Sequence, residues 1–183
     1  EMLKTMKRRY RTDLYQDRVE LIRELMPDAC IGVDVITGHP GETDELFQES
    51  FDFINSLDIS YLHVFTYSER PNTHALILSP VIPKQERKKR THKLRRLSSK
   101  KRFAFDERFE GETRPTLFEE ENKDGFMFGW TNNYVRIAVP FNSRLVNTIQ
   151  QVEIGNYSSD GFHFGKLSQT ILDEESTIAE LLT

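Results

Sequence analysis

The stretch CIGVDVI, residues 30–36, and the turn TGHPGE that follows it, residues 37–42, decide the fold expected for the first half of the chain. A short run rich in valine and isoleucine is typical of a buried strand in a parallel sheet. The turn contains two glycines and a proline, and Thr43 after it is a favourable cap for a helix. The order predicts a strand whose carboxyl end leads directly into a helix, as in a βα unit.

A second strand and further helices surround this unit. YLHVF, residues 61–65, has strand character, and the basic segment 83–109 is predicted to be a long helix. Upstream, residues 2–9 are predicted to end one helix. Alternating strands and helices predict an α/β fold with a parallel sheet. A further helix is expected to begin at Thr12 as its N-cap and to bury a face formed by Leu14, Val19, Ile22 and Leu25.

After Gly111 the pattern changes to short alternating segments separated by tight turns. Such strands predict a small β-barrel of OB type. We therefore expect an α/β domain over residues 1–110, a β-barrel over residues 111–168 and a tail over residues 169–183. The five strands are predicted at residues 113–119, 125–131, 134–140, 149–155 and 161–167.

Composition limits the kinds of protein that the chain can be. The 183 residues are 37% hydrophobic, enough for packed cores. No apolar run approaches the roughly 20 residues that cross a bilayer, so no membrane partner is expected. Cys30 is the single cysteine, which excludes an internal disulfide and a zinc or iron–sulfur site held by several cysteines of this sequence. It also indicates a reducing cytoplasm.

Charge is distributed unevenly along the chain. Residues 84–108 contain 12 basic and 3 acidic side chains, whereas the rest of the chain contains 13 basic and 26 acidic ones. This asymmetry predicts either a polyanion contact such as RNA or a solvated amphipathic helix. In the barrel, Trp130 is expected to fill the core or to offer a stacking surface. The candidate RNA-binding residues are Arg87, Lys88, Arg95, Arg96, Lys100 and Lys101 in the helix, with Tyr134 and Arg136 facing outward from the barrel.

Asp34 and His63 lie on the less apolar side of the two predicted strands. In a closed barrel both would point into the interior, where polar groups are paired or functional. They are therefore either a structural pair or contacts to a polar ligand at the catalytic end of the barrel. The turn and the loop after the second strand lie at the same end, where helix amides and Arg70 could hold an anion. The candidate ligand-lining residues are Gly32, Asp34, Gly38, Pro40, Gly41, Glu42, His63, Tyr67 and Arg70.

Several motifs together resemble the radical S-adenosylmethionine methylthiotransferases. GVDVITGHPGET, residues 32–43, and YSERPNT, residues 67–73, are similar to the late barrel of these enzymes. MKRRY, residues 6–10, resembles the helix that precedes that part. Residues 111–167 resemble their C-terminal TRAM domain, a β-barrel that binds tRNA. The resemblance implies the C-terminal portion of a partial TIM-type barrel followed by an OB-like TRAM barrel.

The resemblance also implies cofactors and partners for a longer, full-length enzyme. Family members use S-adenosylmethionine and two [4Fe-4S] clusters, together with a reductant and a sulfur donor, to modify adenosine 37 in the tRNA anticodon loop. The cysteines that hold those clusters are not in this sequence. We therefore expect no catalytic residue and no metal in this part, and no activity from it alone.

One branch of the family is the most similar. Three stretches resemble the branch that methylthiolates C2 of N6-threonylcarbamoyladenosine: IGVDVI, residues 31–36, YLHVF, residues 61–65, and SERP, residues 68–71. His39 and Asn72 depart from the family, which usually has Phe and Gly there. Enzymes acting on isopentenyladenosine-37 or on ribosomal protein S12 are alternatives, as is a non-catalytic RNA-binding module.

Overall fold

The computed structural model describes residues 3, 6, 8 and 11–168, and these form two compact units. The first unit ends at residue 104 and the second begins at residue 105, so the division lies inside the long basic helix. The sequence places this boundary near residue 110, just after the helix. The helix expected over residues 2–9 and the tail over 169–183 lie largely or wholly outside the described residues.

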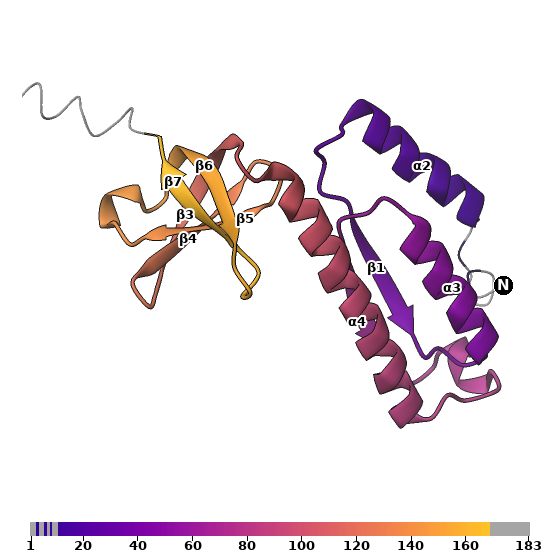
Figure 1. The fold of residues 1–183 in the computed structure, drawn as a ribbon. Helices are drawn as coiled ribbons and strands as arrows, with labels where there is room; N and C mark the ends of the chain where they lie inside the picture. The colour runs from indigo at the N-terminus through magenta and orange to yellow at the C-terminus, as the bar shows by residue number, and fades with distance from the viewer. Residues whose placement is uncertain (1–2, 4–5, 7, 9–10, 169–183) are drawn as a thin grey trace, which may run out of the picture. The chain divides into compact units, whose positions relative to one another are not determined.

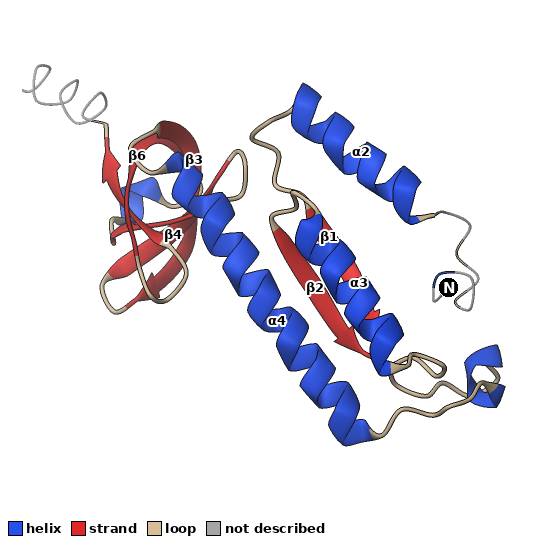
Figure 2. Cartoon of the chain, turned by 45° about the vertical axis from the view of Figure 1, so that its right-hand side comes forward, coloured by secondary structure: helices blue, strands red, loops and turns tan. Residues whose placement is uncertain are grey.

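The first unit is built around two parallel strands, β1 (Gly32–Thr37) and β2 (Tyr61–Thr66). The helices α2 (Thr12–Leu25), α3 (Asp44–Ser56) and α4 (Lys84–Asp106) accompany them, and a short 3-10 helix, η1 (His74–Ile77), precedes α4. Figure 2 shows the two strands side by side, with α3 and α4 along them, and Figure 1 shows β1 between these two helices. The predicted α/β character with a parallel sheet is confirmed.

One face of this sheet forms the core of the unit. Alternate residues on the strands, among them Val33, Val35 and Val64, pack against a buried cluster from the helices. The opposite face, which carries Asp34 and His63, is exposed. The alternation of the sequence therefore assigned the two faces correctly. The buried cluster comprises Val19, Phe47, Ile54, Leu57, Ile59, Leu62, Leu94 and Leu97.

Helix α2 differs from its prediction. Arg11 occupies the N-cap position, and Thr12 is the first helical residue. Val19 is the one fully buried side chain of the helix, whereas Leu14 and Leu25 are exposed to 46% and 70%. The expected face of four buried residues is therefore wrong, because α2 contacts the described core mainly through Val19 and Tyr15.

The outer edge of β2 is covered by α4. The Ser98 hydroxyl accepts a hydrogen bond from the Leu62 amide at 2.8 Å and donates one to the Leu62 carbonyl at 3.0 Å. About two turns nearer the start of α4, the Thr91 hydroxyl lies 2.7 Å from the Thr66 hydroxyl at the end of β2. An open strand edge invites pairing with another chain, and a covering helix prevents it. Helix α4 thus satisfies backbone groups of β2 that no strand in the described residues reaches.

This contact gives a stability prediction. Ser98→Ala should lower the free energy of unfolding by about 1–2 kcal/mol, because it leaves the Leu62 amide and carbonyl without their partner. Urea unfolding followed by circular dichroism measures the change. Ser99→Ala is the matched control, since that hydroxyl bonds only the Arg95 carbonyl of its own helix. Equal losses from both substitutions would contradict the edge-covering role of Ser98.

The second unit is a closed five-stranded barrel in the order β3-β4-β5-β7-β6. Neighbouring strands are antiparallel except for the parallel pair β5 and β7. A core that includes Phe118, Met127 and Ile154 fills it. The predicted OB-like barrel is confirmed. Its elements are η2 (Glu107–Phe109), β3 (Thr113–Lys123), β4 (Phe126–Thr131), β5 (Arg136–Pro140), η3 (Ser143–Leu145), β6 (Ile149–Tyr157) and β7 (His163–Leu167).

The turn between β3 and β4 shows how the sequence sets this topology. Asp124 and Gly125 both have positive φ, 54° and 84°. Two successive residues in that region make the tight turn that matches strand twist in a hairpin, and Asp-Gly is a preferred pair for it.

None of the helices in the described residues is long and apolar enough to cross a membrane.

Candidate ligand-facing sheet and nucleic-acid interface

The exposed face of the first sheet brings together the two polar residues that the sequence singled out. Asp34 on β1 is directly opposite His63 on β2 in the strand register, and both side chains are exposed. The Tyr61 and His63 rings stand edge to face with centroids 4.9 Å apart. That Asp34 and His63 face the interior of a complete barrel stays a prediction for the longer protein, because the described sheet has two strands and leaves this face open.

Gly32 has a packing role on this face. A Cβ atom at this position would lie 2.5 Å from the end of the Tyr61 side chain. Such a contact is closer than carbon atoms approach in close-packed interiors. The glycine therefore makes room for the Tyr61 ring, a role that the sequence did not distinguish from contact with a ligand.

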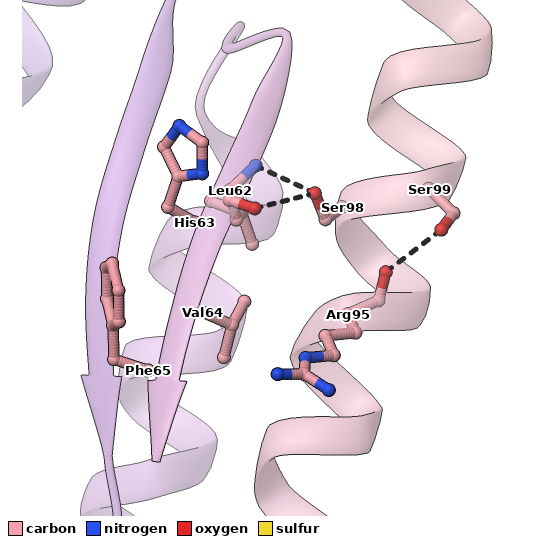
Figure 3. A pocket seen from close by; sticks show the side chains of 7 residues that line it. All are labelled: Leu62, His63, Val64, Phe65, Arg95, Ser98 and Ser99. Atoms are coloured by element: carbon pink, nitrogen blue, oxygen red, sulfur yellow. Dashed lines mark hydrogen bonds between the residues drawn. The ribbon is translucent and has the colours of Figure 1, made fainter. Parts of the chain in front are cut away.

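A groove of about 440 Å³ lies between β2 and α4. It is lined by His63 and Phe65 from the strand and by Arg95, Ser98 and Ser99 from the helix, and Figure 3 shows the Arg95 guanidinium directed toward the strand. The groove thus joins His63, predicted to line a ligand site, with Arg95, predicted to bind RNA. The sequence could not show this proximity, because it depends on the alignment of α4 with β2.

The turn after β1 is packed inside the unit. Gly38, Pro40 and Glu42 are buried, and a Cβ atom at Gly38 would collide with the Arg87 side chain. The Glu42 carboxylate accepts hydrogen bonds from the Gly38 amide at 2.7 Å and from the Thr37 hydroxyl at 3.3 Å. These residues therefore shape the end of β1 from within, and of the predicted ligand-lining residues in the turn only Gly41 is partly exposed.

Arg90 of α4 completes this turn. Its side chain is 4% exposed, and Nη1 donates to both the carboxylate and the carbonyl of Glu42 at 2.7 Å, while Nη2 reaches Asp44 at 2.5 Å. Burial alone would lower the pKa of Arg90, but the hydrogen bonds and charges of Glu42 and Asp44 outweigh it and raise that pKa. Sequence reasoning treated Arg90 as one cation in a basic helix and missed this role.

The Arg90–Glu42 pair gives a second stability prediction. Arg90→Met should lower the free energy of unfolding by roughly 3 kcal/mol or more, because it leaves the buried Glu42 carboxylate without its cation. Lys89→Met removes the neighbouring charge from an exposed position and should change stability by less than about 0.5 kcal/mol. Chemical denaturation of the two variants compares them. A small effect of Arg90→Met would show that the pair does not hold α4 against the turn.

Arg87, which the sequence placed among the RNA-binding residues, is buried in the structure. Arg87 is 3% exposed. Its guanidinium donates hydrogen bonds to the carbonyls of Ile82 and Tyr67 and to the Glu69 carboxylate. The hydrogen bond from Arg87 holds the pKa of Glu69 below its usual value. Arg87 therefore secures the loop after β2 and has no free face for a nucleic acid.

The same loop contains two predicted ligand-lining residues. Tyr67 packs its ring edge to face with His39 at 5.2 Å and under the Arg87 guanidinium at 5.2 Å. Its hydroxyl is buried without a hydrogen-bond partner. Arg70 is exposed, and Asn72 beside it has a φ of 62°, which explains why a residue that tolerates this region stands there. The loop does not bring Arg70 to any acidic partner among the described residues.

Four of the predicted helix residues remain on the surface of α4. Lys88, Arg95, Arg96 and Lys100 are exposed, and we call these four side chains the basic face. Lys101 is different, because its ammonium group donates to the carbonyls of Asn55 and Leu57 at the end of α3. Burial lowers the pKa of Lys101.

The barrel places its two predicted residues as the sequence suggested. Tyr134 is 65% exposed, in a turn with a φ of 63°. The Arg136 guanidinium lies over the Phe128 ring at 4.4 Å and within 3.6 Å of Glu121. Trp130 is half-buried and packs against Tyr134, with ring centroids 6.4 Å apart. Of the two alternatives for Trp130, the structure favours a surface role over complete burial in the core.

No group of three His, Cys, Asp or Glu side chains in the described residues could hold a metal ion. Cys30 has its sulfur 3.5 Å from an Arg102 nitrogen. The described residues therefore do not fit an iron–sulfur cluster.

Comparison with curated proteins finds relatives named for tRNA methylthiolation. Threonylcarbamoyladenosine tRNA methylthiotransferase MtaB of Aquifex aeolicus is 40% identical over 136 residues, which are 74% of this chain and 32% of the relative. The Bacillus subtilis protein of the same name is 30% identical over 157 residues, 84% of this chain and 35% of the relative. The tRNA-2-methylthio-N(6)-dimethylallyladenosine synthase of Protochlamydia amoebophila is 31% identical over 159 residues, which are 86% of this chain and 35% of the relative.

No protein-family model matches the chain. It spans about a third of the length of these curated relatives. The matches nevertheless extend over 74–86% of the chain, and the names of these relatives agree with the family that the motifs resembled. The chain is a homologue of the radical S-adenosylmethionine tRNA methylthiotransferases.

Proposed function

We propose that this chain is part of a longer tRNA methylthiotransferase and supplies one wall of its active site together with its tRNA-binding surface. The observation that carries the proposal is the basic face of α4, four exposed cations on a chain homologous to tRNA-modifying enzymes. Exposed Lys and Arg side chains of this kind bind nucleic acids through contacts with the phosphate groups. The buried cations Arg87 and Arg90 are already neutralised by Glu69 and Glu42, so they take no part.

The substrate that we propose is N6-threonylcarbamoyladenosine at position 37 of the anticodon loop. In support, the Aquifex relative at 40% identity carries that nucleoside in its name. A relative named for N(6)-dimethylallyladenosine is 31% identical, so this nucleoside is the second candidate. Ribosomal protein S12 has no support among the relatives described above, and their names favour an enzyme over a free-standing RNA-binding module.

The exposed sheet face is the proposed site for S-adenosylmethionine or the target adenosine. It offers the carboxylate of Asp34 and the imidazole of His63 beside the exposed side chains of Ile36 and Phe65. This mixture fits a ligand that has a polar sugar and a flat apolar base. S-adenosylmethionine would supply the methyl group and, with a cluster held elsewhere in the full-length enzyme, the radical. A reductant and a sulfur donor would be further partners of that enzyme.

The basic face can be tested by charge reversal. Replacing Lys88, Arg95 and Arg96 together by Glu should weaken tRNA binding at least about tenfold near 150 mM salt, because phosphate contacts are lost and replaced by repulsion. Fluorescence anisotropy over a salt series measures both the affinity and its salt slope, which should fall by about one for each lost contact.

The matched control reverses three exposed cations that lie outside both α4 and the barrel, Arg8, Arg11 and Arg18, and so changes the net charge equally. It should leave most of the affinity in place. If both triple variants lost affinity alike, net charge and not the basic face would be responsible.

The substrate is tested in cells that lack the full-length gene. Mass spectrometry of digested tRNA should show loss of the 2-methylthio derivative of N6-threonylcarbamoyladenosine. The derivative of the dimethylallyl nucleoside should persist. Loss of the latter alone would replace the proposed substrate by the second candidate, and loss of neither would exclude a tRNA methylthiotransferase.

A further inference from the structure

The outer surface of the barrel carries a continuous line of rings. Phe126, Phe128 and Trp130 alternate on β4 and so face one side. Arg136 is directly opposite Trp130 in the strand register. The aromatic face, as we call it, comprises Phe126, Phe128, Trp130, Tyr134, Phe162 and Phe164.

The rings of this face touch one another in sequence. Phe126 contacts Phe164, with centroids 5.8 Å apart, and Phe162 lies 5.3 Å from both Phe164 and Phe128. The Arg136 guanidinium then bridges the line, at 4.4 Å from the Phe128 centroid and 5.8 Å from that of Trp130. The rings therefore hold each other in place, so a partner could stack on them at little entropic cost.

Two rings of the line, one on each side of its middle, are open to solvent. Phe164 is 45% exposed and Tyr134 is 65% exposed, whereas Phe128 in the middle is buried, with 5% of it exposed. Exposed large aromatic side chains that are fixed by neighbours are typical of binding surfaces. They are not needed for the barrel core, which Phe118, Met127 and Ile137 fill from the inner face.

Charge argues against phosphate attraction as the main force here. Residues 105–168 contain 10 acidic and 6 basic side chains, and Glu119, Glu120 and Glu121 are all exposed on β3. Stacking of nucleobases on aromatic rings does not depend on net charge, because every base has an apolar face. The strands β4 and β5 correspond to the second and third strands of the barrel, the face through which OB folds bind single-stranded nucleic acids.

We propose that the aromatic face binds unpaired nucleobases of an RNA single strand by stacking, with Tyr134 and Phe164 as the open positions. This proposal rests on the proposed function, in which the chain binds tRNA, and it adds the mode of binding. The basic face of α4 would contact phosphates, whereas the barrel would contact bases. The two contributions should then respond differently to salt.

The test compares two RNA probes with the whole 183-residue chain. One is a single-stranded uridine oligonucleotide, and the other is an abasic oligonucleotide of equal length with the same number of phosphates. The wild type should bind the first more tightly than the second. Tyr134→Ala and Phe164→Ala should each weaken binding of the first about fivefold or more, corresponding to at least one lost stacking contact.

The salt slope separates this site from the basic face. The two alanine substitutions should leave the slope unchanged, since they remove no phosphate contact. Ile149→Ala is the matched control, because Ile149 is 65% exposed on β6 and lies outside the aromatic face. It should bind both probes as the wild type does, and circular dichroism should show all three variants folded.

Several results would overturn the proposal. Equal affinity of the wild type for the two probes would show that bases contribute nothing. Wild-type affinity of both alanine variants would do the same for the aromatic face. If these variants instead abolished self-association of the chain and kept RNA affinity, the face would bind protein. A loss confined to the charge-reversed α4 variant would leave the proposed function intact and exclude base stacking.

Discussion

The carboxylate of Glu42 is buried at the end of β1, and the arrangement of the first unit depends on how it is neutralised. It accepts the Gly38 amide and the Thr37 hydroxyl from its own turn and the Arg90 guanidinium from α4, a residue 48 positions later. A buried carboxylate without such partners would be very costly. The start of α4 is therefore fixed against the carboxyl end of the sheet. About two turns further along, Ser98 meets the Leu62 backbone and covers the edge of β2.

This constraint separates cations of α4 that are paired within the unit from cations that are exposed on its surface. Arg87, Arg90 and Lys101 point inward to carboxylates or carbonyls of the turn, the loop and the end of α3. Lys88, Arg95, Arg96 and Lys100 remain exposed on the other sides of the helix. Helical periodicity places the two groups on different sides of the helix, since residues three and four apart share a face. The contacts with the turn and the loop then decide which side is buried. A helix whose basic residues look alike in the sequence thus fixes the turn within the unit and also presents the exposed cations that we propose bind a polyanion.

The two surfaces that we propose to bind RNA, one on each unit, are chemically different. The basic face of α4 would bind through charge, and its contribution would weaken with salt. The acidic barrel presents rings that are bridged by Arg136. Stacking on these rings would still contribute to binding when salt screens charge. Such a division is consistent with the proposed function, because an enzyme that modifies a base within a folded RNA must hold both the RNA and a base taken out of its stack. The sheet face with Asp34 and His63 would then meet that base in the full-length protein.

The sequence by itself determined the elements and the faces of the strands. Period-two and helical patterns, together with Asp124-Gly125 and Thr43, act locally, so the α/β unit, the five-stranded barrel and the side of the sheet that bears Asp34 and His63 followed from residues alone. Only the tertiary structure decided which cation meets which acid. Arg87 and Arg90 are indistinguishable in the sequence from Lys88 and Arg95, because burial depends on contacts between segments tens of residues apart. For the same reason, the groove that joins His63 to Arg95 and the line of rings around Arg136 became visible only when the strands and α4 were placed.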